Sequence, residues 1–263
     1  MSIKKSCRGF TLVELLVVIS IISLLMAIMA PSLRQAKEAS RGLHCLNNLR
    51  QLTICWSGYA MDNGGRLCGS HPVVSKYPWV DQFQNGTLDP DWNTPENLQT
   101  GVLWPYHQSI KVYRCTNDIK RQLRSYSLSA LVGGYGRRYH GFEEIRSPNE
   151  KIVFADDRRY WDESHFGFDY DTRFYQATRL YDHYWLGGSD WQFAHADGFN
   201  GNRPTIRHNI GSNYSFADGH CERWGWNDPL FIKSSTKGLT DQEIDKITNE
   251  SEDYDRLRKA MTK

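Results

Sequence analysis

Phe10-Thr11-Leu12-Val13-Glu14 opens an apolar run that continues to Pro31, and this run decides what the rest of the chain can be. At ~1.5 Å per residue, residues 10–30 form a helix about 30 Å long, which is enough to cross a hydrocarbon core. Three basic residues precede the run, and basic flanks stay on the cytoplasmic side. The sequence therefore predicts one membrane anchor, with the remainder of the chain outside the cytoplasm.

Glu14 is unusual for an ordinary secretory signal, which has no carboxylate near the start of its apolar region and has a small-residue cleavage site after it. An ionisable side chain inside a membrane segment costs roughly 2.5 to 3.5 kcal/mol and needs a partner. A new α-amino group, created by cleavage just ahead of Glu14, is a suitable partner.

These residues resemble the type IV prepilin signal of pilins and pseudopilins. The basic leader is residues 1–9, Gly9 precedes the cut, Phe10 is the first mature residue and Glu14 is the fifth. The resemblance implies cleavage between Gly9 and Phe10, and N-methylation of Phe10, by a prepilin peptidase and N-methyltransferase. It also implies that Glu14 pairs with the Phe10 ammonium of a neighbouring subunit and sets axial register. A plain signal anchor with a stray glutamate is the alternative.

Length and charge limit the remaining possibilities. Without the nine leader residues, 254 of the 263 residues remain, which suits one membrane helix and a single globular domain. The formal net charge of +2 falls to about −1, because 29 basic residues then face 30 acidic ones. This balance leaves no electrostatic footprint for nucleic acid, so no nucleic-acid partner is expected.

Five cysteines follow the leader, in what should be an oxidising compartment. They are Cys45, Cys55, Cys68, Cys115 and Cys221. Five cannot all pair within one chain, so a disulfide using two or four of them is possible, and the sequence leaves the connectivity open. The spacings are scattered and contain no C-x-x-C pair, which argues against a zinc cluster.

Residues 31–63 keep a helical pattern that ends at Asn63-Gly64-Gly65, where glycine favours a helix C-terminus. Residues 64–263 then change to short segments separated by Gly, Pro, Asn and Asp, which we expect to form a globular domain of strands. The helical stripe consists of Cys45, Leu49, Leu52, Trp56 and Tyr59. The strand candidates are residues 101–106, 111–115, 124–128 and 151–155. The predicted fold class is pilin-like α+β, with a long N-terminal transmembrane helix packed on a mainly antiparallel sheet.

A hairpin is predicted late in the chain, within residues 208–226. Two strand-like segments flank Asp218-Gly219, a pair that favours a two-residue type I′ turn. His208 is followed by nine residues and then by Asp218-Gly219, a spacing that resembles the prepilin-associated His-x9-Asp-Gly proteins, a family similar to the major pseudopilins. Other segments that look like this family are residues 45–52, 59–65, 113–118, 124–126 and 154–156.

Asp156, Asp157, His208 and Asp218 are weak candidates for a metal site, with calcium favoured if only oxygens contribute. The competing interpretation is that Asp218 and Gly219 form a turn and that His208 is held by a hydrogen bond. A membrane-tethered metal-dependent hydrolase would need Asp156, His208 and Asp218 to converge. The sequence shows no nucleophile elbow, so no catalytic residue is assigned and no enzyme is expected.

Two segments of the domain are harder to interpret. Residues 158–202 interleave aromatic side chains with acids, which indicates either a small core of their own or a surface for sugar rings. In the tail, residues 240–261, Thr240 and Glu243 have the spacing of a capping box, which predicts one or two short helices.

Together these features predict a structural pilin-like or pseudopilin-like subunit. It would be anchored in the inner membrane with its domain periplasmic or extracellular, and would assemble with other pilin-like subunits on an inner-membrane platform. The filament would be a type II secretion-like pseudopilus or a type IV pilus-like fibre, and the sequence leaves the machine open. The alternative is a membrane-anchored binding module for carbohydrate or another surface polymer.

Overall fold

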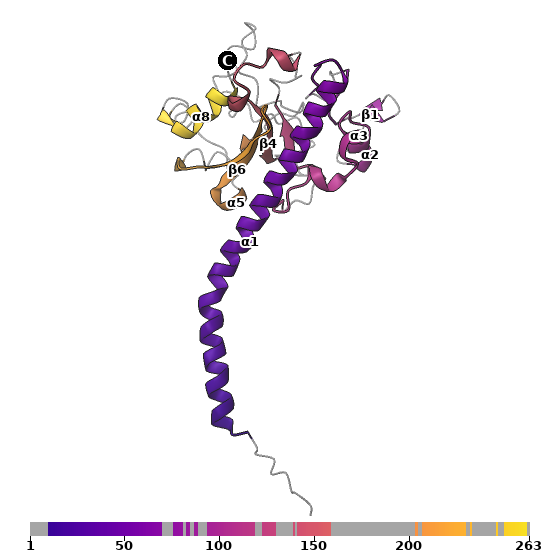
Figure 1. The fold of residues 1–263 in the computed structure, drawn as a ribbon. Coiled ribbons are helices and arrows are strands. Elements are labelled where there is room, and N and C mark those ends of the chain that lie inside the picture. The colour runs from indigo at the N-terminus through magenta and orange to yellow at the C-terminus, as the bar shows by residue number, and fades with distance from the viewer. Residues whose placement is uncertain are drawn as a thin grey trace, which may run out of the picture. The chain divides into compact units, whose positions relative to one another are not determined.

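The computed structural model describes most of the chain outside the leader. The described residues are 10–69, 76–80, 83–84, 87–88, 94–118, 123–129, 139, 141–158, 203–204, 207–229, 232, 246 and 250–261. Two compact units are present, Met1–Ser40 and Arg41–Lys263, and helix α1 (Leu12–Asp62) belongs to both (Figure 1). Apart from Arg158, the aromatic segment 158–202 lies outside the described residues, as does the proposed capping box of the tail.

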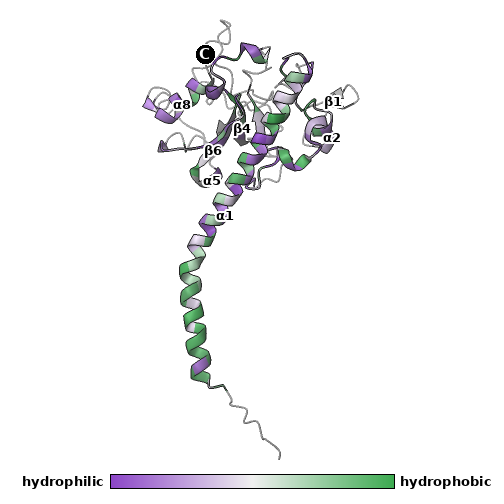
Figure 2. Cartoon of the chain, in the orientation of Figure 1, coloured by the Kyte–Doolittle hydropathy of each residue, from purple (hydrophilic) through white to green (hydrophobic). Residues whose placement is uncertain are grey.

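The N-terminal part of α1 begins with a capping box formed by Thr11 and Glu14. The Thr11 N–H and hydroxyl donate to Glu14 Oε2 at 2.8 and 2.7 Å, and the Glu14 N–H donates to Thr11 Oγ1 at 3.2 Å. The first half of α1 is almost continuously hydrophobic (Figure 2), and its large apolar side chains are exposed. The helix continues through Pro31. By length and composition, α1 is the one helix in the described parts of the chain that could cross a membrane.

The second half of α1 packs on the globular unit. Its buried residues are Gly42, Cys45, Asn48, Leu49, Leu52, Thr53, Cys55, Trp56, Tyr59 and Ala60, which include the whole stripe expected from the sequence. The helix ends where Gly64 and Gly65 take φ values of 63° and 82°, and the Gly65 N–H donates to the Ala60 carbonyl at 2.7 Å. Such a glycine-based C-cap satisfies carbonyl groups left over at a helix end.

An antiparallel sheet forms the centre of this unit, with strand order β3-β4-β6-β7. Its strands are β3 (Tyr126–Leu128), β4 (Ile152–Arg158), β6 (Gly211–Phe216) and β7 (Cys221–Gly225). The short β5 (Arg203–Pro204) pairs with the end of β4, and β1 (Phe83–Gln84) pairs separately with β2 (Thr87–Leu88). The predicted fold class is thus confirmed, as a long N-terminal apolar helix packed against a four-stranded antiparallel sheet.

A buried hydroxyl pair joins α1 to the sheet. Thr53 Oγ1 lies 2.6 Å from Ser215 Oγ of β6, and Ser215 Oγ also accepts the Phe154 N–H of β4 at 3.2 Å. Thr53 and Ser215 are fully buried. Thr53 Oγ1 also lies 2.9 Å from the Leu49 carbonyl of its own helix. The hydroxyl pair is therefore a buried polar contact between α1 and the sheet.

Short helices replace two of the expected strands. Residues 101–106 and 111–115 had strand-like compositions, but the structure has α3 (Trp104–His107) and η1 (Ile110–Tyr113) there. Pro105 in the first turn explains part of this, because proline has no N–H for a sheet but fits the start of a helix. The other short helices are α2 (Pro95–Gln99), η2 (Phe142–Glu144), η3 (Pro148–Glu150), α5 (Arg207–Ile210) and α8 (Glu252–Met261).

The β6–β7 hairpin has a different turn from the predicted type I′. The Phe216 N–H donates to the His220 carbonyl at 3.0 Å and the Gly219 N–H donates to the Phe216 carbonyl at 2.9 Å, so the loop has three residues. Within it, φ is positive at Gly219 (92°) but not at Asp218. This pattern fits a type I turn followed by a left-handed glycine, which the Asp-Gly pair also allows. The two-residue prediction was therefore wrong.

Candidate functional site

The residues at the processing site are only partly described. Gly9 lies outside the described residues, and Phe10 is exposed. The Glu14 carboxylate accepts two hydrogen bonds from Thr11, and both fall on Oε2. Within one chain, Glu14 therefore already has a partner, which partly offsets the cost of a charge in an apolar segment. Sequence reasoning overlooked Thr11, although Thr-x-x-Glu is the pattern of a capping box.

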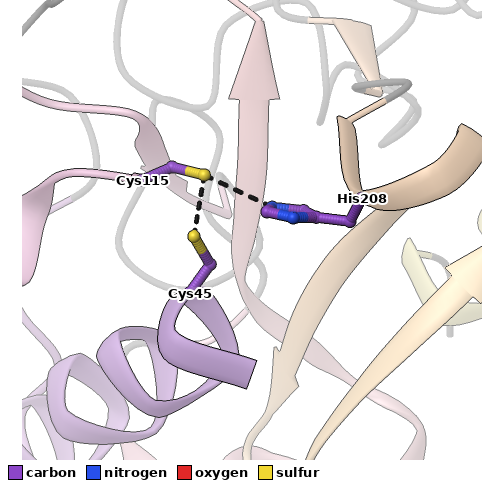
Figure 3. Close-up of side chains that lie close together, drawn as sticks. All are labelled: Cys45, Cys115 and His208. Carbon is purple, nitrogen blue, oxygen red and sulfur yellow. Dashed lines mark hydrogen bonds between the residues drawn. The ribbon is translucent and has the colours of Figure 1, made fainter. Parts of the chain in front are cut away.

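A second group of functional side chains is buried in the globular unit, where Cys45, Cys115 and His208 point toward one another (Figure 3). Cys45 comes from α1, Cys115 follows η1, and His208 belongs to α5. Cys115 Sγ lies 2.8 Å from Cys45 Sγ and 3.3 Å from His208 Nε2. Both sulfurs are fully buried and His208 is 3% exposed.

The backbone around His208 is held in an uncommon conformation. His208 has φ of 58° and Ile210 has φ of 57°, in the left-handed region. Such residues cost on the order of 1 to 3 kcal/mol each and persist only when their surroundings fix them. Here the Arg223 Nε of β7 donates to the His208 carbonyl at 2.6 Å. On the other side, a Cβ built on Gly42 of α1 would meet the imidazole at 3.7 Å, so the helix passes close to the ring.

Asp156 of β4 completes the cluster. Its Oδ2 lies 2.9 Å from His208 Nε2, and its Oδ1 accepts from Arg207 Nη1 at 2.7 Å. Arg207 Nη2 also lies 3.6 Å from Asp118 Oδ2. The Asp156 side chain is fully buried, so both of its oxygens face a basic group without access to water. Such pairing is what makes a buried carboxylate tolerable.

The protonation states follow from these contacts. Burial lowers the pKa of His208, but its hydrogen bond to Asp156 and the nearby Cys45 sulfur outweigh that effect and raise the pKa to about 9. The hydrogen bond from Cys115 lowers the pKa of Cys45, and the same bond raises the pKa of the Cys115 thiol. With both thiols reduced, the raised pKa of His208 and the lowered pKa of Cys45 favour an imidazolium beside a thiolate at neutral pH.

The cluster does not have the geometry of a cysteine-histidine-aspartate triad. In such a triad the acid orients one ring nitrogen while the other faces the nucleophile. Here Asp156 and Cys115 both contact Nε2 of His208, and Nδ1 lies 3.4 Å from Asn117 Nδ2. Both sulfurs are also buried, so a substrate has no direct approach to them.

Two thiols, an imidazole and a carboxylate are donors suited to zinc rather than calcium. The ligand atoms of Cys45, Cys115 and His208 all lie within 4.8 Å of one another. The lack of a C-x-x-C pair therefore does not exclude such a grouping, because the side chains come from three distant segments. A metal ion would have to compete with Asp156 for His208 Nε2.

The metal candidates from the sequence separate into two places. Asp156 and His208 lie together in the cluster, whereas Asp218 lies in the turn beyond the far end of β6, about 20 Å along the strand. Asp218 Oδ1 contacts His220 Nδ1 at 2.5 Å and accepts the His220 N–H at 3.0 Å. Asp157 belongs to β4, and its side chain lies outside the described residues. The convergence that a metal-dependent hydrolase would need therefore does not include Asp218.

Sequence reasoning missed Cys45, Cys115 and Arg207 as members of the site. One signal was available for the cysteines, because they lie in two segments, 45–52 and 113–118, that share the family resemblance. Arg207 carried the weaker signal of a basic residue adjacent to His208.

Comparison with known proteins bears on the N-terminal segment. Comparisons with curated proteins and with solved structures gave no match. Residues 4–30 match the family model described as the prokaryotic N-terminal methylation motif. This match covers the end of the leader and the exposed apolar part of α1. The chain thus carries a prepilin-type signal, which implies processing by a prepilin peptidase and indicates a membrane-anchored, pilin-like protein.

Proposed function

We propose that the chain is a structural subunit of a type II secretion-like pseudopilus or a type IV pilus-like filament. The leader is cut between Gly9 and Phe10, Phe10 is methylated, and the mature chain leaves the inner membrane by packing through α1. The observation that carries this proposal is an exposed apolar helix that lies within the matched N-terminal methylation motif.

The exposed part of α1 requires a cover. Its large apolar side chains between Phe10 and Met29 are 43 to 79% exposed. At about 25 cal/mol for each Å² of apolar surface removed from water, leaving such a face in solvent is strongly unfavourable. Lipid covers it while the subunit is in the membrane, and the helices of neighbouring subunits cover it in a filament.

Glu14 supports the step from membrane to filament. In one chain Thr11 already donates two hydrogen bonds to Oε2 of the carboxylate. This lowers the free-energy cost of holding Glu14 in the bilayer before assembly. Because both bonds use Oε2, the Phe10 ammonium of a neighbour can approach Oε1 without breaking the cap. The charge pair then fixes the axial register of two subunits.

The competing function is a membrane-anchored binding module for carbohydrate or another surface polymer. It depends on the aromatic residues of 158–202, which lie outside the described residues. The two functions differ in where the mature protein is found, because a lone anchored binder stays in the membrane whereas a filament subunit is recovered from the cell surface.

A leader variant tests the proposal in native cells. Gly9→Val should block cleavage, keep the protein in the membrane fraction and remove it from the material sheared off the surface. Ser6→Ala, in the same leader, is the matched control and should behave as the wild type. Equal amounts of Gly9→Val and wild-type protein in the sheared fraction would contradict the proposal, as would a wild-type protein confined to the membrane.

A further inference from the structure

We propose that Cys45 and Cys115 form a disulfide in the exported protein and clamp α1 to the segment that follows η1. This inference rests on the proposed function in one respect, because it requires the globular unit to lie outside the cytoplasm, where disulfides persist.

The first support is the placement of the two sulfurs. Cys45 Sγ and Cys115 Sγ lie 2.8 Å apart although the residues are 70 positions apart in the sequence, and both are fully buried. The five cysteines after the leader are free thiols in the structure, and Cys45 and Cys115 are brought within hydrogen-bond distance of each other. Asn48, one turn after Cys45, donates from Nδ2 to the Arg114 carbonyl at 3.0 Å. The two segments are therefore already held side by side at the residues that flank the sulfurs.

The second support is what surrounds the sulfurs. A zinc ion would need a free lone pair on His208 Nε2, but that nitrogen contacts Asp156 at 2.9 Å, and Arg207 holds the other carboxylate oxygen. Metal binding through Nε2 would displace the Asp156 carboxylate from that nitrogen. Two sulfurs on one tetrahedral zinc would also lie about 3.8 Å apart, given Zn–S distances near 2.3 Å. A disulfide leaves the contacts of Asp156 intact.

The oxidation can be written with its oxidant. The Cys45 thiolate attacks the disulfide of an extracytoplasmic thiol oxidoreductase, which forms a mixed disulfide and releases one thiolate of that enzyme. The Cys115 thiolate then attacks the Cys45 sulfur and releases the second. Two electrons and the two cysteine protons pass to the oxidoreductase, which leaves as a dithiol. Because both sulfurs are buried in the folded unit, the exchange takes place before α1 packs on the sheet.

The cross-link has a consequence for a filament subunit. Cys45 lies at the start of the part of α1 that is buried in the globular unit, three residues after Gly42. A pull on the exposed part of the helix during extraction or in a filament reaches the globular unit at this point. A covalent bond here keeps α1 joined to the segment that follows η1 when the exposed part of the helix is pulled.

The test is disulfide mapping of the full chain from native cells. Thiols are alkylated with N-ethylmaleimide during lysis in denaturant, and non-reduced peptides are analysed by mass spectrometry. We expect the peptides of Cys45 and Cys115 to be linked and Cys55 to be alkylated. Cys55→Ser, in the same helix, is the matched control and should keep the link, whereas Cys115→Ser should leave Cys45 open to alkylation.

Three results would overturn the inference. They are alkylation of both Cys45 and Cys115 in the wild-type chain, a link from either residue to a different cysteine, and one bound zinc per chain with both thiols reduced. The same digest reports the N-terminus, which separates the two proposals. A chain with N-methyl-Phe10 and reduced thiols would contradict the disulfide and support the filament subunit. A chain with an uncut leader and linked cysteines would support the disulfide and contradict the filament subunit.

Discussion

Asp156 Oδ2 lies 2.9 Å from His208 Nε2 in the interior of the globular unit, and this contact joins the central strand β4 to the turn that leads into the β6–β7 hairpin. Arg207 holds the second carboxylate oxygen at 2.7 Å. A buried carboxylate between two basic side chains thus sets the position of His208, whose backbone is strained. Charge pairing, rather than apolar packing alone, holds this part of the sheet together.

Asp156→Asn should destabilise the protein by about 3 to 5 kcal/mol, because it removes the carboxylate that faces the buried His208 imidazole and one of the two carboxylates that face Arg207. The measurement is the free energy of unfolding of the full chain in detergent, obtained by urea unfolding that is monitored by tryptophan fluorescence. Asp218→Asn is the matched control, since its partner His220 is 41% exposed at the side chain, and it should cost less than about 1 kcal/mol. Equal losses for the two variants would contradict the role of the cluster.

Stability should fall as pH rises from about 6.5 toward 9. Asp156, Arg207, Cys45 and Cys115 face His208. Its pKa is raised from 6.5 to about 9, against the effect of burial. A raised pKa gives stability that is complete below 6.5 and is lost as pH passes the folded value.

In the oxidised protein Cys45 has no thiol to titrate, and its contribution to the raised pKa of His208 is lost. Asp156 alone then raises that pKa, so the loss of stability should be complete below pH 9. In the reduced protein the lowered pKa of Cys45 acts in the opposite direction, so the slope should be flatter. His208→Gln should remove the slope in the oxidised protein. If His208→Gln kept the wild-type dependence of stability on pH, another group would be its cause.

Thr53→Val should cost about 1 to 3 kcal/mol, because it removes the hydroxyl that pairs with Ser215 at 2.6 Å in a fully buried place. The double variant with Ser215→Ala should lose less than the sum of the two single losses, since the two hydroxyls share one interaction. Thr100→Val, whose hydroxyl is exposed, should change the free energy of unfolding by less than about 0.5 kcal/mol. If the double variant lost as much free energy of unfolding as the two single variants together, the pairing of Thr53 with Ser215 would be contradicted.

Gly219→Ala should destabilise the hairpin by about 1 kcal/mol through its backbone alone. Gly219 has φ of 92°, and no atom lies within 4 Å of a Cβ placed there, so steric contact does not contribute. Gly225→Ala in the same hairpin is the control, because that glycine has neither a positive φ nor a close contact. If thermal unfolding shows the two variants to be equally affected, the turn assignment fails.

Glu14→Val should leave leader cleavage intact and prevent incorporation into surface filaments, because the register-setting charge is lost while the cleavage site at Gly9 is unchanged. Immunoblots of membrane and sheared fractions measure both effects. Ser23→Ala, in the same apolar segment, should assemble normally, since its hydroxyl bonds only to the Ile19 carbonyl of its own helix. Normal incorporation of Glu14→Val would remove the register argument.

Much of the fold was predictable because its signals are local. The four-and-three spacing of Cys45, Leu49 and Leu52 predicts a buried helix face, and the segments around Asp218-Gly219 predict a hairpin. The helices at residues 104–113 were missed, because elements of four residues have no periodicity to detect and depend on tertiary packing.

The candidate site was only half predictable for a related reason. Gly9, Phe10 and Glu14 lie within six positions of one another, so their spacing alone carries the prediction. Cys45, Cys115 and His208 meet only after α1, η1 and α5 have packed together. A sequence pattern does not record contacts between segments 70 or more residues apart. The contact between His208 and Asp156 was one of several that the sequence allowed, since Asp157 and Asp218 were candidates as well.

The most direct test of the filament-subunit account is mass spectrometry of the N-terminal peptide from native cells, with membrane and sheared surface material compared. The account predicts a peptide that starts at N-methyl-Phe10 in both fractions. A chain that keeps Met1 or Ser2 at its terminus and occurs only in the membrane would contradict the filament subunit and favour the anchored binding module.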